Sequence, residues 1–244
     1  MSWFSGFKKK ELESIDFSVL KTDIHSHLIP GIDDGAIDLD NSLDLICALQ
    51  ELGFSKIITT PHTMSDFYKN TPEIIIKGRK DVQNALDKFN IEIEFEAASE
   101  YYVDFDFQKK IEKKEFLTFG SKYILIEFSF IDAPINIDEI IFNLQLSGYN
   151  VVLAHPERYL YYGLKDYERM TSKGVLLQLN LLSITGYYSP EVKKQAEKLI
   201  NADLVSFVGT DCHKMRHIES LKKCFTNPLW HKLLVSKKLH NKTL

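Results

Sequence analysis

The chain has 244 residues, of which 44% are hydrophobic and 26% charged, and its formal net charge is −4. This length suits one large globular domain, and the acidic balance offers no basic surface for nucleic acid. The three cysteines are odd in number and share no Cys-x-x-Cys spacing, which argues against a disulfide framework and indicates a reducing, cytoplasmic compartment.

Residues 1–20 are predicted to form an N-terminal extension. It contains Trp3, Phe4 and Phe7 beside the lysines at positions 8–10, a group that could touch a membrane surface or pack on the body of the protein. It lacks the apolar core of a signal peptide, and no apolar run approaches the roughly 20 residues that cross a bilayer. We therefore expect no stable membrane insertion.

From residue 21 onward, short β-rich runs alternate with amphipathic helical patterns. Strands are predicted at 21–25, 56–60, 91–99, 122–128, 150–155, 175–180 and 204–210, and helices at 38–53, 71–89, 136–149 and 189–203. The last helix has the clearest signature, with Ser189 as N-cap and Pro190 at its first position. Several strands are nearly continuous Val, Ile and Leu, as expected when helices cover a parallel sheet. This alternation predicts one α/β domain, either a (β/α) barrel or a doubly wound sheet.

Polar side chains gather near the C-terminal ends of the predicted strands. In chain order they are His25, His27, Asp33, Asp34, His62, Glu100, Glu127, His155, Arg158, Asn180, Asp211 and His213. Strand ends in an α/β fold open onto one face, so these residues are expected to converge. Imidazole and carboxylate ligands suit zinc, manganese and iron. Five histidines with several carboxylates are too many for one tetrahedral site and favour two or three ions that share bridging carboxylates.

Several of these residues also have a purely structural explanation. A strand-end histidine such as His62 could be a satisfied core residue, and Asp33 or Asp34, beside glycines, could be a turn residue. Glu127 lies in an apolar strand, where burial without a partner is costly, and this favours a ligand role. The side chains expected outside the site are Cys212, which strand alternation turns away, and His217, His231 and His240, which are expected on the surface or in helices.

Six segments match, in order, the motifs of a known superfamily: DIHSHLIPGIDDGA, TTPH, ASEYYV, YILIEF, LAHPERY and GTDCH. The sequence resembles the PHP (polymerase and histidinol phosphatase) metallo-hydrolases, and most of all their bacterial tyrosine-phosphatase branch, the capsule-regulating CpsB/YwqE-type enzymes. The likeness runs from about residue 21 to the C-terminus, so residues 21–244 are interpreted as one PHP-type domain. The resemblance implies a distorted (β/α)7 TIM-like barrel that holds two or three divalent ions, commonly manganese, with iron or zinc as alternatives.

Transferred motif by motif, the resemblance also implies ligands and catalytic residues. One ion takes His25, His27, Glu100 and Asp211, a second shares Glu100 and adds Glu127 and His155, and the third takes Asp34, His62 and His213. Arg158 would hold the phosphate, because a guanidinium can contact two phosphate oxygens, and Arg216 is a further candidate for phosphate binding. The implied catalytic residues are Arg158, Asp211 and His155. The sequence departs from some relatives at Thr63, where they carry another histidine.

The implied reaction is hydrolysis of a phosphomonoester by a metal-activated water. The implied substrate is phosphotyrosine on a cytoplasmic tyrosine autokinase of capsule or exopolysaccharide production. No cysteine stands in the C-x5-R loop of thiolate phosphatases. Aromatic residues near the expected site, among them Tyr101, Phe130, Tyr159 and Tyr188, could stack on a phosphotyrosine ring or only cap the barrel. The alternative is a small-molecule phosphatase of the histidinol-phosphate type. A scaffold with an inactive site and an exonuclease fit less well, given the intact ligand set and the acidic balance.

Overall fold

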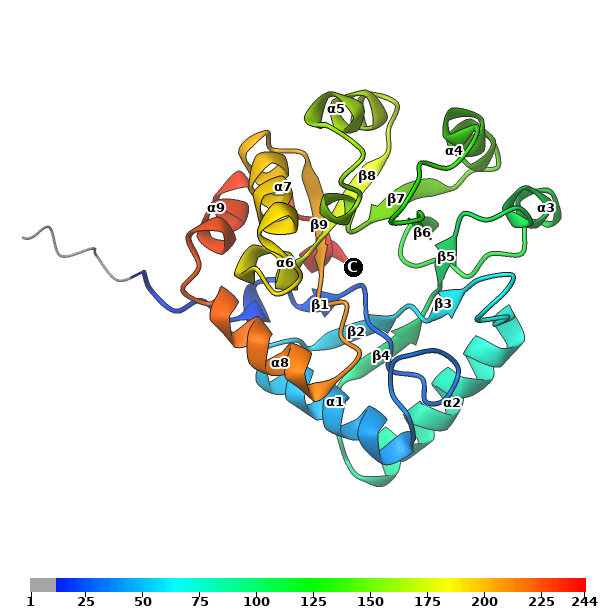
Figure 1. Cartoon of the computed structure of the whole chain (residues 1–244). Coiled ribbons are helices and arrows are strands. Elements are labelled where there is room, and N and C mark those ends of the chain that lie inside the picture. Colours follow the sequence, from blue (N-terminus) through cyan, green and yellow to red (C-terminus); the bar gives the residue numbers. More distant parts are fainter. Residues whose placement is uncertain (1–11) are drawn as a thin grey trace, which may run out of the picture.

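The computed structural model describes residues 12–244 (Figure 1), so the predictions for Trp3, Phe4, Phe7 and the lysines at 8–10 lie outside the described residues. The strands are β1 (Thr22–Asp23), β2 (Lys56–Thr59), β3 (His62–Thr63), β4 (Glu94–Ala97), β5 (Glu100–Tyr102), β6 (Tyr123–Glu127), β7 (Asn150–Ala154), β8 (Leu176–Asn180) and β9 (Val205–Gly209). One sheet has the order β1-β2-β4 and the other β3-β5-β6-β7-β8-β9, with parallel pairing throughout. The predicted α/β class with parallel strands is confirmed.

The two sheets continue into each other where two strands are briefly interrupted. Thr60 and Pro61 separate β2 from β3, and Ala98 and Ser99 separate β4 from β5. Backbone pairing persists across the break, because the Ala98 N–H donates to the Thr59 carbonyl at 2.9 Å and the Glu100 N–H donates to the Pro61 carbonyl at 3.1 Å. Each interrupted pair therefore occupies a single strand position, and the residues after the break turn toward the strand ends.

The first and last strands close the arrangement. The Asp211 N–H donates to the His25 carbonyl at 2.8 Å, and the His27 N–H donates to the Cys212 carbonyl at 2.9 Å. Three residues earlier in each segment, the Asn241 side chain bonds the Thr22 carbonyl at 3.0 Å and the backbone N–H and carbonyl of Val208 at 3.0 and 2.8 Å. With the interruptions counted as single strands, seven strand positions form a ring within residues 12–244, as in a distorted (β/α)7 barrel.

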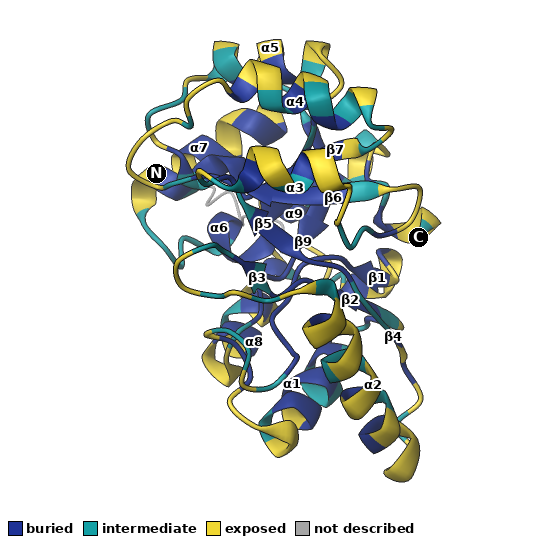
Figure 2. Cartoon of the chain, turned by 90° about the vertical axis from the view of Figure 1, so that its right-hand side faces the viewer, coloured by how far each residue is buried: buried dark blue, intermediate teal, exposed yellow. Residues whose placement is uncertain are grey.

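Helices surround this ring, as Figure 1 shows, and Figure 2 shows buried strands enclosed by helices whose outer faces are exposed. The helices are α1 (Leu39–Glu51), α2 (Pro72–Lys88), α3 (Phe107–Lys113), α4 (Ile137–Leu146), α5 (Leu164–Ser172), α6 (Leu181–Thr185), α7 (Pro190–Asn201), α8 (Met215–Leu221) and α9 (Pro228–Ser236). The four predicted helices correspond to α1, α2, α4 and α7. The Ser189 cap is confirmed, because its hydroxyl accepts from the Val192 N–H at 3.2 Å.

Apolar side chains fill two regions, one inside the strand ring and one between the ring and the helices. Part of the predicted N-terminal extension belongs to the second region. Phe17 is fully buried, and its ring centroid lies 5.2 Å from that of Phe54 and 5.4 Å from that of Trp230. The Trp230 indole N–H donates to the Ile15 carbonyl at 2.9 Å. Across residues 12–244, every helix is too short or too polar to cross a membrane.

Candidate metal centre

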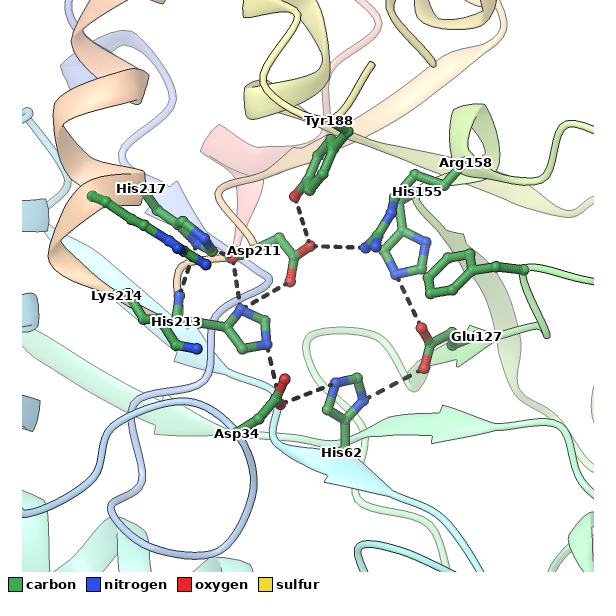
Figure 3. Close-up of a pocket in the computed structure, with 12 residues that line it drawn as sticks. Asp34, His62, Glu127, His155, Arg158, Tyr188, Asp211, His213, Lys214 and His217 are labelled. Carbon is green, nitrogen blue, oxygen red and sulfur yellow. Dashed lines mark hydrogen bonds and ion pairs between the residues drawn. The ribbon is translucent and has the colours of Figure 1, made fainter. Parts of the chain in front are cut away.

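A cavity of about 220 Å³ opens at the C-terminal ends of the strands (Figure 3). It is lined by Asp34, His62, Glu127, Phe130, His155, Arg158, Tyr188, Asp211, His213, Lys214, Arg216 and His217. His25, His27 and Glu100 are completely buried and in contact distance of these lining residues. The sequence prediction that distant strand ends converge is therefore confirmed for the whole proposed ligand set.

Glu100 stands at the centre of this set. Its Oε2 lies 3.2 Å from His25 Nε2, 3.4 Å from His27 Nε2 and 3.1 Å from His62 Nδ1. Its Oε1 lies 2.9 Å from His155 Nε2. One carboxylate thus faces four imidazoles that come from three strand ends, which is the arrangement of a carboxylate that bridges ions.

Several of these facing atoms have no hydrogen-bond partner among the described residues. They include His25 Nε2, His27 Nε2, His62 Nδ1 and Glu100 Oε2. Buried polar atoms are almost always bonded, so a convergent group of unbonded nitrogen and oxygen atoms marks the place of a ligand. Imidazole nitrogen beside carboxylate oxygen is the donor set of zinc, manganese or iron. The residues present therefore fit divalent transition-metal ions.

The opposite nitrogens of two of these histidines are fixed by neighbours. His25 Nδ1 lies 2.7 Å from Gln178 Oε1, and His27 Nδ1 lies 2.8 Å from Asp33 Oδ2. Such contacts hold a ligating ring in one tautomer and orientation. Asp33 Oδ2 also accepts from the His62 N–H at 3.1 Å. Of the two aspartates considered as turn residues, Asp33 is the one that supports the loop, and Asp34 reaches the cavity.

Asp211 connects the buried ligands to the cavity wall. Its Oδ1 lies 3.5 Å from both His25 Nε2 and His27 Nε2. Its Oδ2 accepts hydrogen bonds from Asn180 Nδ2 at 2.7 Å and the Tyr188 hydroxyl at 3.1 Å. The carboxylate therefore has one oxygen toward the proposed ion and the other held in place.

A third group forms at the side of the cavity nearest α8. Asp34 Oδ1 lies 3.4 Å from His213 Nε2 and 3.7 Å from His62 Nε2. The other nitrogen of His62 lies 3.4 Å from Glu127 Oε2, so His62 stands between two groups rather than in one. Glu127 Oε1 in turn lies 3.6 Å from His155 Nε2. Three sets of convergent ligand atoms result: His25, His27 and Glu100; His62, Glu100 and Glu127; and His27, Asp34, His62 and His213.

The electrostatics of the buried carboxylates also fit cations. Burial raises the pKa of Glu100, but His25 and His62 more than offset this and hold the pKa well below its usual range. Burial and the neighbouring charge of Glu100 raise the pKa of Glu127 well above its usual range. Two carboxylates that repel each other in one buried space can both be ionised when a positive charge lies between them.

An aromatic and basic wall rises above these ligands. The Arg158 guanidinium carbon lies 4.1 Å from the Phe130 ring centroid and 4.5 Å from the Tyr188 ring centroid. Arg158 Nη1 lies 3.4 Å from Asp211 Oδ2. Arg216 is exposed and lines the same cavity, as does Lys214. The wall thus presents positive charge beside the proposed ions, where an anion would enter.

Residues outside the predicted set also contribute to the site. The expectation that His217 stands apart from it is wrong: this side chain lies in α8 but is buried, lines the cavity and accepts from the His213 N–H at 3.2 Å. Its position four residues after His213 was the available signal. Gln178 was overlooked because it sits inside an apolar strand. Cys212 is fully buried in the core, as predicted.

Comparison with known proteins identifies relatives over most of the chain. Residues 21–233 match the family described as capsular polysaccharide synthesis, CpsB/CapC. The tyrosine-protein phosphatase YwqE of Bacillus subtilis is 31% identical over 204 residues, which are 80% of this chain and 78% of that protein. The tyrosine-protein phosphatase CpsB of Streptococcus pneumoniae is 28% identical over 201 residues, 79% of this chain and 83% of that one.

Solved structures agree with these matches. One solved structure comes from work on YwqE of Bacillus subtilis and CpsB of Streptococcus pneumoniae, which are described as unique metal-dependent tyrosine phosphatases. It aligns with this chain with a TM-score of 0.76 and 29% identity, over 91% of this chain and 94% of that chain. Histidinol phosphate phosphatase of Lactococcus lactis aligns with a TM-score of 0.51 and 14% identity, over 91% and 94% of the two chains, and shares the fold. Family match, sequence identity and architecture coincide over most of the chain, which therefore belongs to the CpsB/CapC family of capsular polysaccharide synthesis.

Proposed function

We propose that this protein is a metal-dependent protein tyrosine phosphatase. The observation that carries the proposal is the position of Arg158, held between the rings of Phe130 and Tyr188 directly beside the buried imidazole and carboxylate groups. A phosphate seated there would meet a guanidinium on one side and the ligand set on the other. The names of the relatives, tyrosine-protein phosphatases in Bacillus and Streptococcus, support the same reaction.

The ligand set would hold two or three divalent ions, and manganese is the proposed metal, with iron or zinc as alternatives. The first ion would take His25, His27, Glu100 and Asp211, the second Glu100, Glu127 and His155, and the third Asp34, His62 and His213, with His62 also within reach of the second. When bound, such ions neutralise phosphate charge and lower the pKa of a coordinated water.

The side chains of the wall would bind and orient the substrate. Arg158 would donate to two phosphate oxygens and favour the charge that accumulates on them during transfer. Asp211 and His155 are proposed as catalytic together with Arg158, because Asp211 Oδ2 lies 3.4 Å from Arg158 Nη1 and His155 Nε2 lies 2.9 Å from Oε1 of the shared Glu100. A tyrosine leaving group, with a pKa of about 10, needs less protonation than an alkyl alcohol. Cys212 and Cys224 are buried in the core and are not required.

The proposed substrate is phosphotyrosine on a tyrosine autokinase of capsular or exopolysaccharide export, met in the cytoplasm. The description of the family, capsular polysaccharide synthesis, supports this choice. The proposed catalytic domain spans residues 21–244 and follows an extension of residues 1–20, of which Phe17 packs in the core.

A substrate panel tests the proposal. The protein would be stripped of metal, reloaded separately with manganese, iron or zinc, and assayed with a phosphotyrosine peptide, a phosphoserine peptide and histidinol phosphate. We expect metal-dependent hydrolysis with preference for the phosphotyrosine peptide. A preference for histidinol phosphate would replace the proposed function by the small-molecule alternative, and full activity of the stripped protein would remove the metal requirement.

The ligand assignment is tested separately by metal analysis. Asp211→Ala and His155→Ala are expected to lower both bound metal and rate, because each removes an atom that faces the buried group. Unchanged metal content together with an unchanged rate would contradict the assignment. Lys232→Ala on α9 serves as a control, since its ammonium bonds Asn201 at 2.6 Å on the outer surface.

A further inference from the structure

Large apolar side chains are exposed on the loops that follow four neighbouring strands, β3, β5, β6 and β7. We call this group the apolar rim; it consists of Phe67, Phe105, Ile131, Ile135 and Leu160, which are 80%, 71%, 81%, 86% and 55% exposed. Single exposed apolar residues need no explanation. A group on adjacent loops at one face is characteristic of a binding surface.

The apolar rim borders the cavity. In a parallel barrel the loops after the strands share the face on which the strands end, and that face carries the proposed ligands. Phe130 joins the two features, because it lines the cavity, stacks on Arg158 and immediately precedes Ile131. The rim therefore continues the cavity wall outward.

Hydrogen bonds connect each rim-bearing loop to the next. The Ser65 N–H donates to Asp104 Oδ2 at 2.8 Å, which joins the loops of Phe67 and Phe105. The Val103 N–H donates to the Glu127 carbonyl at 2.9 Å. The Tyr161 hydroxyl donates to the Ser129 carbonyl at 2.7 Å, which joins the loop of Leu160 to that of Ile131. The apolar side chains of the rim are thus carried by loops that are hydrogen-bonded to one another.

The other side of the cavity mouth has the opposite character. Lys214 and Arg216, which follow β9, line it with positive charge. The cavity itself, at about 220 Å³, is smaller than the roughly 300–1,000 Å³ of pockets that enclose drug-sized ligands. It has room for a phosphorylated side chain, and whatever carries that side chain must lie outside, over the mouth.

We propose that the apolar rim docks the polypeptide that carries the phosphotyrosine, by contact with apolar side chains that flank the modified residue. This inference rests on the proposed function and specifies its substrate class: a phosphorylated protein segment with apolar neighbours rather than an isolated aryl phosphate or a polar phosphopeptide. Arg158 and the ligand set receive the phosphate, and the apolar rim receives the flanking residues.

The test compares peptides of equal length in which Leu, Ser or Asp flanks the phosphotyrosine, with p-nitrophenyl phosphate as a substrate that has no flanks. Metal-loaded wild type is expected to prefer the Leu-flanked peptide over the Ser-flanked one by about tenfold or more in kcat/KM, the effect of burying one large apolar side chain. The double variant Phe105→Ser, Ile131→Ser should lose that preference and keep its rate on p-nitrophenyl phosphate within about twofold. Val235→Ser, an equally exposed position on α9 (78%), should behave as wild type.

Each contrary result has a distinct meaning. Equal losses on p-nitrophenyl phosphate would show that the rim only shapes the catalytic site, and a flank preference that survives the double variant would also overturn the proposal. Binding of wild type, but not of the double variant, to phosphatidylcholine vesicles or to itself, without a flank preference, would assign the rim to a membrane or to a second copy. Failure to hydrolyse phosphotyrosine in any substrate would overturn the proposed function as well.

Discussion

Replacement of Arg158 by lysine tests whether the proposed phosphate site needs the planar guanidinium or only a positive charge. The guanidinium lies between two rings, 4.1 Å from the Phe130 centroid and 4.5 Å from the Tyr188 centroid. Lysine retains the positive charge but has no planar group to stack there and no second donor in the fixed geometry that matches two phosphate oxygens. The variant therefore removes bidentate binding while the charge of the cavity stays unchanged.

The magnitude follows from the hydrogen bonds that each variant removes. One hydrogen bond between charged partners contributes about 1.5–3 kcal/mol, which corresponds to a fall in kcat/KM of roughly 10–150-fold for Arg158→Lys. Arg158→Ala removes both bonds and the charge, so roughly 10²–10⁴-fold is expected. Bound metal should not change, because Asp211 Oδ2 is still held by Asn180 and Tyr188 at 2.7 and 3.1 Å.

The assay measures kcat and KM on a phosphotyrosine peptide and on p-nitrophenyl phosphate, with metal content determined on the same preparations. Both substrates should be affected alike, because Arg158 would contact the phosphate that they share. Activity of Arg158→Lys within threefold of wild type would refute bidentate binding. Loss of metal in parallel with activity would show that Arg158 acts through Asp211 instead.

Three further predictions concern the support of the site, the core and the thiols. Gln178→Leu should weaken metal binding by about 10–100-fold, because His25 loses the partner that orients its ring. Titration of the metal-free protein with manganese measures this affinity, and an unchanged affinity would contradict the prediction. Phe17→Ala should lower the free energy of unfolding by about 3–5 kcal/mol in urea denaturation, as for other buried phenylalanines, whereas a change below about 1 kcal/mol would place Phe17 outside the cooperative core. Iodoacetamide should leave phosphatase activity intact. Burial raises the pKa of the Cys212 and Cys224 thiols, and the third cysteine, Cys47, lies on α1 rather than among the residues that line the cavity. Rapid inactivation would indicate that a thiol takes part in the reaction.

The sequence was most informative where a polar residue ended an apolar strand. His25, His155 and Asp211 stand out against their surroundings, and parallel topology alone brings such ends together. Glu127 was predictable for a related reason, since a carboxylate in an apolar strand requires a partner. Site residues could therefore be predicted where a polar side chain stands among apolar neighbours in the sequence.

Residues that act through other residues gave no such contrast. Gln178 orients His25, but a glutamine within Leu-Leu-Gln-Leu-Asn also suits a strand with one polar contact. Glu157 is completely buried and accepts from the Asn180 N–H at 2.9 Å and the Ser183 hydroxyl at 2.6 Å. In the sequence it stands out only as part of the motif that contains Arg158. Partners of this kind are set by three-dimensional contacts between segments that the sequence does not bring together.

The short helices were missed for a different reason. α3 and α8 have seven residues each, and α5 and α9 have nine. Two turns contain too few apolar repeats to distinguish a helix from a loop. The continuations β3 and β5 were likewise absent from the prediction, which ended the two strands at residues 60 and 99.

The joining of the first and last strands has a consequence for how the protein is made. His25 and His27 follow β1, whereas Asp211 and His213 follow β9, and Asn241 fastens those two strands together. A chain emerging from the ribosome therefore carries the proposed ligands His25 and His27 long before Asp211 and His213 exist. Such distant pairing makes folding slow compared with folding through local contacts. The complete proposed ligand set exists only after synthesis is nearly finished, so a metal held by that set would load at the last stage of folding.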